Sequence, residues 1–288
     1  MVVKMITEKK EQVKNKSVLL FSGGMDSVIF NKLLNPDVLL YINSGVNYES
    51  EEKRCLSNLI SNKYIDKKKL IILDNVVNLS QFERDDKIVP NRNAILMMIA
   101  SLYGETLYLG SVSGDRSFDK DEKFYKLIKK LLDHMWEEQH WTEKREFKIL
   151  SPYKNTTKTE LVKKYLELNN DPESLFVSFS CYDPVSVYPY MPFNFHFYPF
   201  HYSVPCGQCK PCFRKWVSLI NNNVKIPKNY FYKDPWRVKW LHNVLPLIRI
   251  GKWRGKEDKD IWSALEKQQD FNLKSVAKKL ALEIISKQ

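Results

Sequence analysis

Short apolar runs alternate with amphipathic stretches over the first two thirds of the chain. The runs that predict buried strands are 17–21, 37–43, 69–73, 106–110 and 147–150. The stretches with helical periodicity are 28–34, 49–63, 93–103, 121–138 and 160–168. Strands that alternate with helices favour a parallel sheet with helices on both faces. The sequence therefore predicts an α/β fold built on a doubly wound parallel sheet.

The pattern changes towards the carboxyl end of the chain. Residues 1–16 are predicted to be a polar leader, and 17–180 the sheet domain. Residues 181–220 hold four cysteines and an aromatic insertion, and 221–288 are predicted to be a helical extension. Within the extension, helical spacing is clearest at 260–266 and 275–286. Its Trp-rich composition fits either a binding interface or helices that pack on their own domain.

Composition narrows the classes of protein that fit. No run approaches the roughly 18 apolar residues of a membrane-spanning helix, and the start of the chain lacks the apolar stretch of an export signal. We therefore expect a cytoplasmic protein without a membrane partner. The net charge of +12 is compatible with nucleic-acid binding, but the basic residues are mixed with acidic ones, as on solvated helix faces. A nucleic-acid partner stays open and is not favoured.

A glycine-containing loop joins the first predicted strand to the first predicted helix. Its sequence is Ser22-Gly23-Gly24-Met25-Asp26-Ser27. Two glycines let the backbone approach an anion closely, and helix-start amides and hydroxyl groups can surround it. The six residues resemble the phosphate loop of the PP-loop superfamily, which has the adenine nucleotide alpha hydrolase-like fold and splits ATP between its α and β phosphates. The resemblance implies an adenylated intermediate rather than transfer of a γ-phosphoryl group.

Four of the five cysteines gather in one region. Cys206, Cys209 and Cys212 follow one another at three-residue steps, and Cys181 precedes them. This spacing predicts a tetrahedral, structural zinc site with four sulfur ligands. A redox-active Cys-x-x-Cys pair and an iron–sulfur cluster remain alternatives, and His196 or His201 could replace one ligand. Cys55 is predicted to be a core residue.

Several further segments resemble the 7-cyano-7-deazaguanine synthase family of PP-loop enzymes. They are Val89-Pro90-Asn91-Arg92-Asn93, Ser151-Pro152-Tyr153, Lys158-Thr159-Glu160, Ser180-Cys181-Tyr182, and the run from Cys206 to Cys212 followed by Arg214. Their order and approximate spacing agree with the family from Ser17 to about Trp216. The resemblance implies that the carboxylate of 7-carboxy-7-deazaguanine is adenylated with Mg-ATP and that ammonia displaces AMP. An amide forms first, and a second adenylation yields the nitrile.

The same resemblance implies roles for individual residues. The predicted ATP-binding residues are Phe21, Ser22, Gly23, Gly24, Met25, Asp26 and Ser27. The predicted catalytic residues are Asp26, Ser27 and Arg92. The predicted substrate residues are Arg92, Asn93, Gly110, Asp115 and Ser117. Arg92 alternatively serves in a structural ion pair. The implied cofactors are ATP, Mg²⁺ and Zn²⁺, with zinc on Cys181, Cys206, Cys209 and Cys212.

Two segments depart from the family pattern. Residues 115–121 keep Asp115 and Ser117 of the family's pocket motif, and in part Asp119, but lose its Gly-Tyr-Pro. Residues 46–49 replace its Gln-Arg-His. The aromatic insertion 188–202 either covers a planar base, docks a partner, or forms a small core on the zinc site. These departures leave open a ligase that couples the activated carboxylate to an amine of a protein partner, a homodimer, or a tRNA-modifying enzyme.

Overall fold

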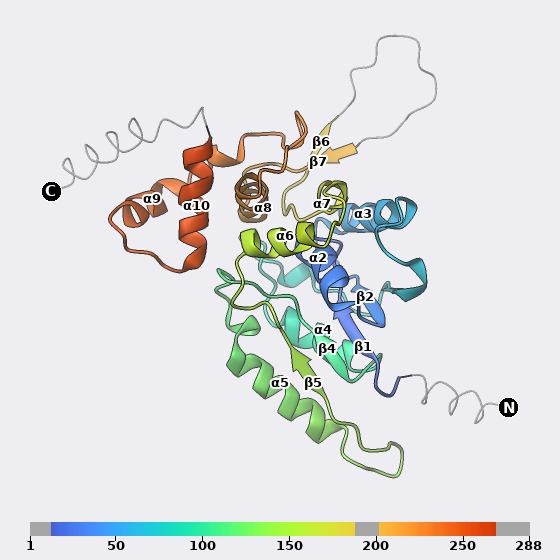
Figure 1. Cartoon of the computed structure of the whole chain (residues 1–288). Helices are drawn as coiled ribbons and strands as arrows, with labels where there is room; N and C mark the ends of the chain where they lie inside the picture. The colour runs from blue at the N-terminus through green and yellow to red at the C-terminus, as the bar shows by residue number, and fades with distance from the viewer. Residues whose placement is uncertain (1–12, 188–201, 269–288) are drawn as a thin grey trace, which may run out of the picture. The chain divides into compact units, whose positions relative to one another are not determined.

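The computed structural model describes residues 13–187 and 202–268 (Figure 1). The chain divides into two compact units, Met1–Thr156 and Thr157–Gln288. The predicted domain boundaries at residues 16, 180 and 220 remain predictions. In the described part of the chain, every helix falls short of the length and apolar character that a membrane crossing requires.

The first unit contains a five-stranded sheet in the order β3-β2-β1-β4-β5, in which all neighbours run parallel. The strands are β1 (Ser17–Leu20), β2 (Val38–Ile42), β3 (Leu70–Leu73), β4 (Thr106–Tyr108) and β5 (Lys148–Leu150). Strand β1 lies at the centre, where Val18 pairs with Val38 of β2 and with Leu107 of β4. The predicted parallel α/β sheet is confirmed.

Four helices of the first unit follow the strands. They are α2 (Met25–Leu34), α3 (Glu49–Ser61), α4 (Arg92–Ala100) and α5 (Glu122–Met135), with short 3₁₀ turns η1 (Lys67–Lys69), η2 (Ser80–Phe82) and η3 (Phe118–Lys120). The apolar sides of α4 and α5 bury a core in which Leu40 and Leu107 of the sheet meet Met97 of α4 and Leu132 of α5. Burial of such side chains is the main stabilising contribution in a domain of this size.

The topology of the sheet places the candidate nucleotide loop. The chain leaves β1 towards β2 on one side, and β4 lies on the other side. In open α/β sheets this reversal of strand order creates a crevice at the carboxyl ends of the strands, and ligands bind there. The loops 21–24, 43–48 and 109–117 follow the carboxyl ends of β1, β2 and β4. The segments that sequence analysis singled out therefore come from one edge of the sheet.

The second unit is mostly helical. Its elements are α6 (Lys158–Glu167), α7 (Glu173–Val177), α8 (Lys210–Asn221), η4 (Pro235–Arg237), α9 (Leu241–Arg249), α10 (Lys256–Lys267) and the antiparallel pair β6 (Val185–Val187) and β7 (Tyr202–Val204). Helix α6 begins with the predicted capping box, in which Thr157 accepts a hydrogen bond from the Glu160 amide and Glu160 accepts one from the Thr157 amide. Helix α8 and the β6–β7 pair were not predicted.

The helical extension packs against α8 within its own unit. Phe213 and Trp216 of α8 are fully buried beside Val238, Leu245 and Ile261 of the following segments. Trp236, Trp240 and Trp262 pack against the same cluster, whereas Trp253 is 41% exposed. Most of the tryptophan enrichment therefore belongs to a core. The predicted helix 275–286 and most of the aromatic insertion, 188–201, lie outside the described residues.

Candidate functional site

The loop after β1 has the backbone shape of a phosphate-binding turn. The Phe21 amide donates to the Leu40 carbonyl (2.9 Å) and extends the pairing of β1 with β2. Gly23 then takes a positive φ of 73°, and Gly24 is the N-cap of α2. Because glycine has no side chain to cap a helix, the amino end of α2 is of the kind that binds anions through its amides and dipole.

Side chains of this loop divide into exposed and packed groups. Phe21 and Met25 are 2% and 1% exposed, so their side chains belong to the core and only their backbone is suited to bind a nucleotide. Ser22 is exposed and accepts a hydrogen bond from the Gly24 amide (3.3 Å). The Ser27 hydroxyl is buried and donates to the Gly24 carbonyl (2.8 Å). Asp26 is half-buried in the first turn of α2.

Helix α3 supports the loop at Gly23. The Cys55 thiol donates to the Gly23 carbonyl (3.3 Å), and a Cβ on Gly23 would lie 3.3 Å from Leu56. Cys55 is 3% exposed, which confirms that it is a core residue. The shape of the phosphate loop therefore depends on packing as well as on its own two glycines.

Arg92 and Asn93 begin helix α4. Arg92 donates from Nη1 to the Tyr48 hydroxyl (3.2 Å). The buried Asn93 donates from Nδ2 to a carboxylate oxygen of Asp119 (2.7 Å), and the Ser117 hydroxyl donates to the other oxygen of Asp119. Asp119 thus connects two of the predicted substrate residues.

The remaining predicted substrate residues have structural partners of their own. Asp115 accepts a hydrogen bond from the Val112 amide (3.2 Å) and lies 3.7 Å from the Lys120 ammonium group. At Gly110, a Cβ would lie 2.8 Å from the Phe30 ring. The absence of a side chain at Gly110 is therefore explained by packing. A role for Gly110 and Asp115 in substrate binding stays a prediction.

Residues 46–49, which replace the family's Gln-Arg-His, are held in place by hydrogen bonds to the buried carboxylate of Glu83. Asn47 donates from its amide (3.0 Å) and from Nδ2 (3.2 Å) to the two carboxylate oxygens of Glu83, whose side chain is 4% exposed. Val46 and Tyr48 are each 5% exposed. The different residues in this loop therefore pack within the unit and bring the Tyr48 hydroxyl to Arg92.

Sequence analysis missed a pair of ionisable residues that joins β2 to α3. The Tyr41 hydroxyl donates to Glu52 (3.1 Å), which is half-buried on α3. Burial raises the pKa of Glu52 to about 7, although the Tyr41 hydrogen bond and the Arg92 charge lower it. Neither residue belongs to a motif, and the contact joins β2 to α3. Only the apolar context of Tyr41 in a buried strand could have drawn attention to it.

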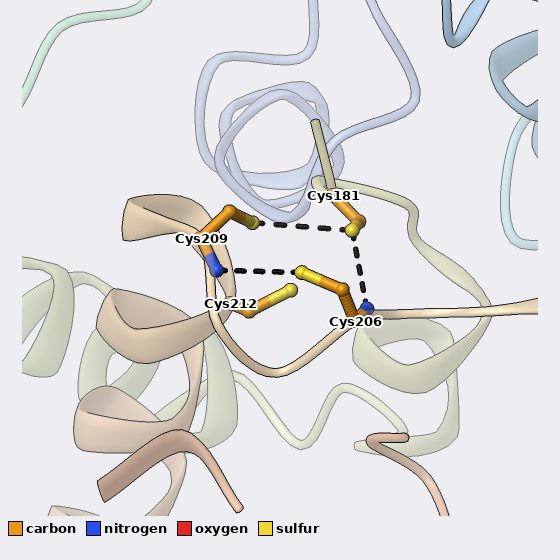
Figure 2. A group of neighbouring side chains, drawn as sticks. All are labelled: Cys181, Cys206, Cys209 and Cys212. Atoms are coloured by element: carbon orange, nitrogen blue, oxygen red, sulfur yellow. Dashed lines mark hydrogen bonds between the residues drawn. The ribbon is translucent and has the colours of Figure 1, made fainter. Parts of the chain in front are cut away.

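In the second unit, the structure brings the four predicted metal ligands together (Figure 2). The Sγ atoms of Cys181, Cys206, Cys209 and Cys212 all lie within 4.8 Å of one another. Tetrahedral zinc with Zn–S bonds of about 2.3 Å requires sulfur–sulfur distances of roughly 3.8 Å. The cluster is therefore compatible with a zinc ion bound by four sulfur atoms.

Backbone amides surround the sulfur atoms. The Cys206 amide donates to Cys181 Sγ (3.2 Å), and the amides of Gln208 and Cys209 each donate to Cys206 Sγ (3.3 Å). Hydrogen bonds from backbone amides favour the thiolate over the thiol, and the thiolate is the form that binds metal.

A buried lysine joins the two segments that carry these cysteines. Lys215 of α8 is 3% exposed and donates to the Ser178 carbonyl (2.8 Å), the Ser178 hydroxyl (3.1 Å) and the Tyr230 hydroxyl (2.6 Å). Ser178 lies three residues before Cys181, and Lys215 three residues after Cys212. The lysine therefore holds the segment of Cys181 against the helix of Cys212.

Comparison with known proteins agrees with this arrangement. The sequence model of the family described as Queuosine biosynthesis protein QueC matches residues 16–223. A 7-cyano-7-deazaguanine synthase of Hahella chejuensis is 25% identical over 242 residues, covering 76% of this chain and 94% of that protein. A 7-cyano-7-deazaguanine synthase of Chlorobaculum parvum is 23% identical over 243 residues, covering 75% of this chain and 96% of that protein. Because the family model spans both the phosphate loop and the four cysteines, the chain belongs to the Queuosine biosynthesis protein QueC family.

Proposed function

We propose that the chain is an ATP-consuming ligase that activates the carboxylate of 7-carboxy-7-deazaguanine and lets ammonia displace AMP. The observation that carries the proposal is the glycine turn between β1 and α2 at the switch point of the sheet. The names of the two related synthases support the choice of substrate.

The proposed reaction that forms the amide has two nucleophilic steps, adenylation of the carboxylate and displacement of AMP by ammonia. A carboxylate oxygen attacks the α-phosphorus of ATP, and the bond to the β-phosphate breaks, releasing pyrophosphate. The nitrogen of ammonia then attacks the acyl carbon, the bond to AMP breaks with its electron pair on AMP, and nitrogen loses a proton to form the amide. In a second round the amide oxygen is adenylated, and loss of AMP and protons gives the nitrile.

Catalysis of this kind depends mainly on positioning and on compensation of charge. The amides near Gly23 and Gly24 and the Ser22 hydroxyl are proposed to bind the phosphates of ATP. Asp26 provides a carboxylate suited to Mg²⁺, a cation that favours oxygen ligands and accompanies nucleotide phosphates. Arg92 is proposed to orient the carboxylate of the base. Asn93, Asp115 and Ser117 are proposed to line the pocket.

The proposed role of zinc is structural. Four sulfur ligands complete a tetrahedral site and leave no position for a substrate. The ion would link the segment of Cys181 to the turn of Cys206 and Cys209 and to helix α8. All protein chemistry in the reaction is therefore assigned to the first unit.

A protein amine as the acceptor, instead of ammonia, is a second candidate. Its support is the altered pocket segment 115–121, in which the Phe118 side chain is 91% exposed. An exposed aromatic residue at this position is suited to contact a partner surface. Binding to tRNA is a third outcome of the same test and has only the net charge of +12 as support.

The proposal is tested by mass spectrometry of a reaction with Mg-ATP, 7-carboxy-7-deazaguanine and ammonium. AMP together with the amide or nitrile is the expected result. AMP without these products, or activity that requires an added protein or tRNA, would favour the other acceptors.

Substitution of the phosphate loop tests the assignment of the site. Asp26→Ala should lower AMP formation by about a hundredfold or more, since it removes a charged group from the phosphate site. Asp85→Ala changes an exposed aspartate of the same unit and serves as the matched control. Full turnover in Asp26→Ala or Ser27→Ala would contradict the catalytic assignment.

A further inference from the structure

Residues 224–268, which lie beyond the end of the family match at residue 223, have an uneven distribution of charge. They contain eleven lysines and arginines and five acidic residues, so half of the chain's net charge of +12 falls within this segment. All eleven basic residues are exposed, whereas Glu266 alone of the five acidic residues is exposed. The surface of the segment is therefore more basic than its sequence, in which acids and bases are mixed, indicates.

Acidic residues of this segment form contacts within their own unit. Asp258 is fully buried and accepts hydrogen bonds from the Arg254 amide (2.8 Å) and from Arg254 Nε (3.1 Å). Asp234 lies 3.2 Å from Nε of Arg237. Among the described residues, the salt bridges of the segment are those of Arg237 and Arg254. Nine of its eleven basic residues therefore have no described carboxylate within salt-bridge distance.

The turn between α9 and α10, residues 247–256, has a defined backbone shape (Figure 1). Gly251 has a positive φ of 75°, and its amide donates to the Ile248 carbonyl (3.0 Å). The Lys252 amide donates to the Leu247 carbonyl (2.9 Å). These two bonds form a Schellman motif, which ends α9. The buried aspartate described above ties the other end of the α9–α10 turn to α10.

Apolar and basic side chains share the surface of the α9–α10 turn. Trp253 is 41% exposed, and Leu247 and Ile250 are 39% and 65% exposed. Trp253 Nε1 would lie 3.9 Å from a Cβ on Gly251, so the indole lies against the turn itself. The exposed cations of the turn that form no salt bridge with a described residue are Arg249, Lys252 and Lys256. An exposed indole therefore lies in a short stretch of chain that also presents three such cations.

We propose that the α9–α10 turn binds single-stranded nucleic acid, with a base stacked on Trp253 and phosphates beside the three cations. Lysine and arginine attract the phosphate backbone and gain affinity from the release of its counterions. An aromatic ring among such cations offers a face on which a base of any sequence can stack. In a duplex the bases are already stacked on one another, so the exposed indole favours a single strand. The binding does not depend on the proposed function, and no reaction on the strand is proposed.

An anionic membrane surface fits the α9–α10 turn less well. A helix that lies in a membrane interface buries its apolar face in the lipid. The apolar face of α9 is already buried in the core of the second unit, through Leu241, Leu245 and Ile248. The basic residues of segment 224–268 also extend from Lys225 to Lys267, a spread along the chain that suits a long polyanion.

The test is fluorescence anisotropy of a labelled, unstructured strand of about twelve nucleotides, a usual site size, with the whole chain and no ATP. The same sequence is offered as RNA, as DNA and as a DNA duplex over a range of salt concentrations. We expect both single strands to bind more tightly than the duplex. If three phosphates are neutralised, the logarithm of the association constant should fall with the logarithm of the salt concentration with a slope of about −2.

Two variants separate stacking from charge. Trp253→Ala should weaken binding of the single strands roughly tenfold or more and leave the salt slope unchanged, and Trp253→Phe should restore part of the affinity. Arg249→Gln combined with Lys252→Gln should reduce the magnitude of the salt slope by about 1.4, since each phosphate contact on a single strand contributes about 0.7.

Matched changes in the first unit serve as controls. Trp141 is 53% exposed, and Lys123 and Lys130 are exposed on α5. Trp141→Ala, and Lys123→Gln combined with Lys130→Gln, should keep the affinity and the salt slope of the natural chain. The substituted residues of both units are exposed, so every variant should keep its zinc content and its thermal unfolding.

Several results would overturn the inference. They are a lack of binding to either single strand at low salt, equal losses in the turn variants and the controls, or duplex binding that is as tight and does not depend on Trp253. Binding to vesicles of anionic phospholipid or to polyglutamate that depends on Trp253, without binding to the strands, would assign the turn to a membrane or to an acidic protein. AMP formation by the same variants reports on the proposed function alone, so the two proposals fail separately.

Discussion

The phosphate loop of the first unit and the cysteine turn of the second each depend on a glycine with positive φ, 73° at Gly23 and 76° at Gly207. Their surroundings differ. A Cβ on Gly23 would meet the side chains of Cys55 at 3.2 Å and Leu56 at 3.3 Å, which can shift slightly. A Cβ on Gly207 would lie 1.8 Å from the carbonyl oxygen of Lys233, which is backbone. The turn at Gly23 could therefore accept a small side chain after slight shifts, whereas the turn at Gly207 has no room for one.

This difference fits the roles proposed for the two sites. The phosphate loop is proposed to bind an anion reversibly through backbone and hydroxyl groups, so the packing beneath it only needs to preserve its shape. The cysteine turn must bring four sulfur atoms into one small volume, and segment 232–234 covers it through the Tyr232 and Lys233 amides, which donate to the carbonyls of Pro205 and Cys206. Metal binding to such a site contributes directly to folding.

The largest expected effect comes from removal of a metal ligand. Cys212→Ser should lower the bound zinc to well below one ion per chain and destabilise the second unit by several kcal/mol, because metal binding is part of its folding free energy. Metal analysis and thermal unfolding measure both quantities. Cys55→Ser, in the first unit, keeps a hydrogen-bond donor to Gly23 and should retain the metal. Equal zinc content in the two variants would rule out the cysteine cluster as the zinc site.

A smaller loss of stability should follow from the added methyl group of alanine at Gly207 in the cysteine turn. Gly207→Ala is expected to cost about 3 kcal/mol or more in the free energy of unfolding, because the overlap with Lys233 forces the backbone to move. Gly251→Ala has the same positive φ, but its Cβ would find its nearest neighbour, Trp253, at 3.9 Å. This control should cost only about 1 kcal/mol of backbone strain. Similar losses in urea unfolding would show that the Lys233 contact is unimportant.

The smallest effect on stability is expected at the phosphate loop. Gly23→Ala should cost about 1 kcal/mol of backbone strain, and the altered loop should bind ATP roughly tenfold more weakly. Equilibrium binding of α,β-methylene-ATP measures the affinity, and unchanged zinc content serves as the control. If ATP affinity were unchanged, the shape of this turn would not matter for the nucleotide.

Local patterns were sufficient for most of the first unit. The predicted strands appear because each is a short apolar run with a turn signal after it, as at Gly23 and Gly45. Helix α8 was missed because it begins within the cysteine spacing, at Lys210, where the metal motif hides the helical period. The pair β6–β7 was missed because its two strands have three residues each and are separated by the aromatic insertion.

In the candidate site, too, local sequence patterns revealed some residues and missed others. The loop 22–27 and the four cysteines could be singled out from the sequence because both motifs rest mainly on close spacing along the chain. Glu52 was not found, because its contact with Tyr41 joins residues of different elements and leaves no periodic signal. The bond from Asn47 to Glu83 was hidden for the same reason, since it spans 36 positions.

By itself, the sequence determined the parallel α/β class, the phosphate-loop motif, the ligand set of the cysteine cluster and the capping box at Thr157. These depend on local spacing and on the intrinsic preferences of glycine, cysteine and apolar residues. Only the tertiary structure decided that Phe21 and Met25 are core residues, that Lys215 holds the segment of Cys181, and that Glu52 accepts a hydrogen bond from Tyr41. Burial and charge interactions arise when distant segments pack together, so they are properties of the folded chain.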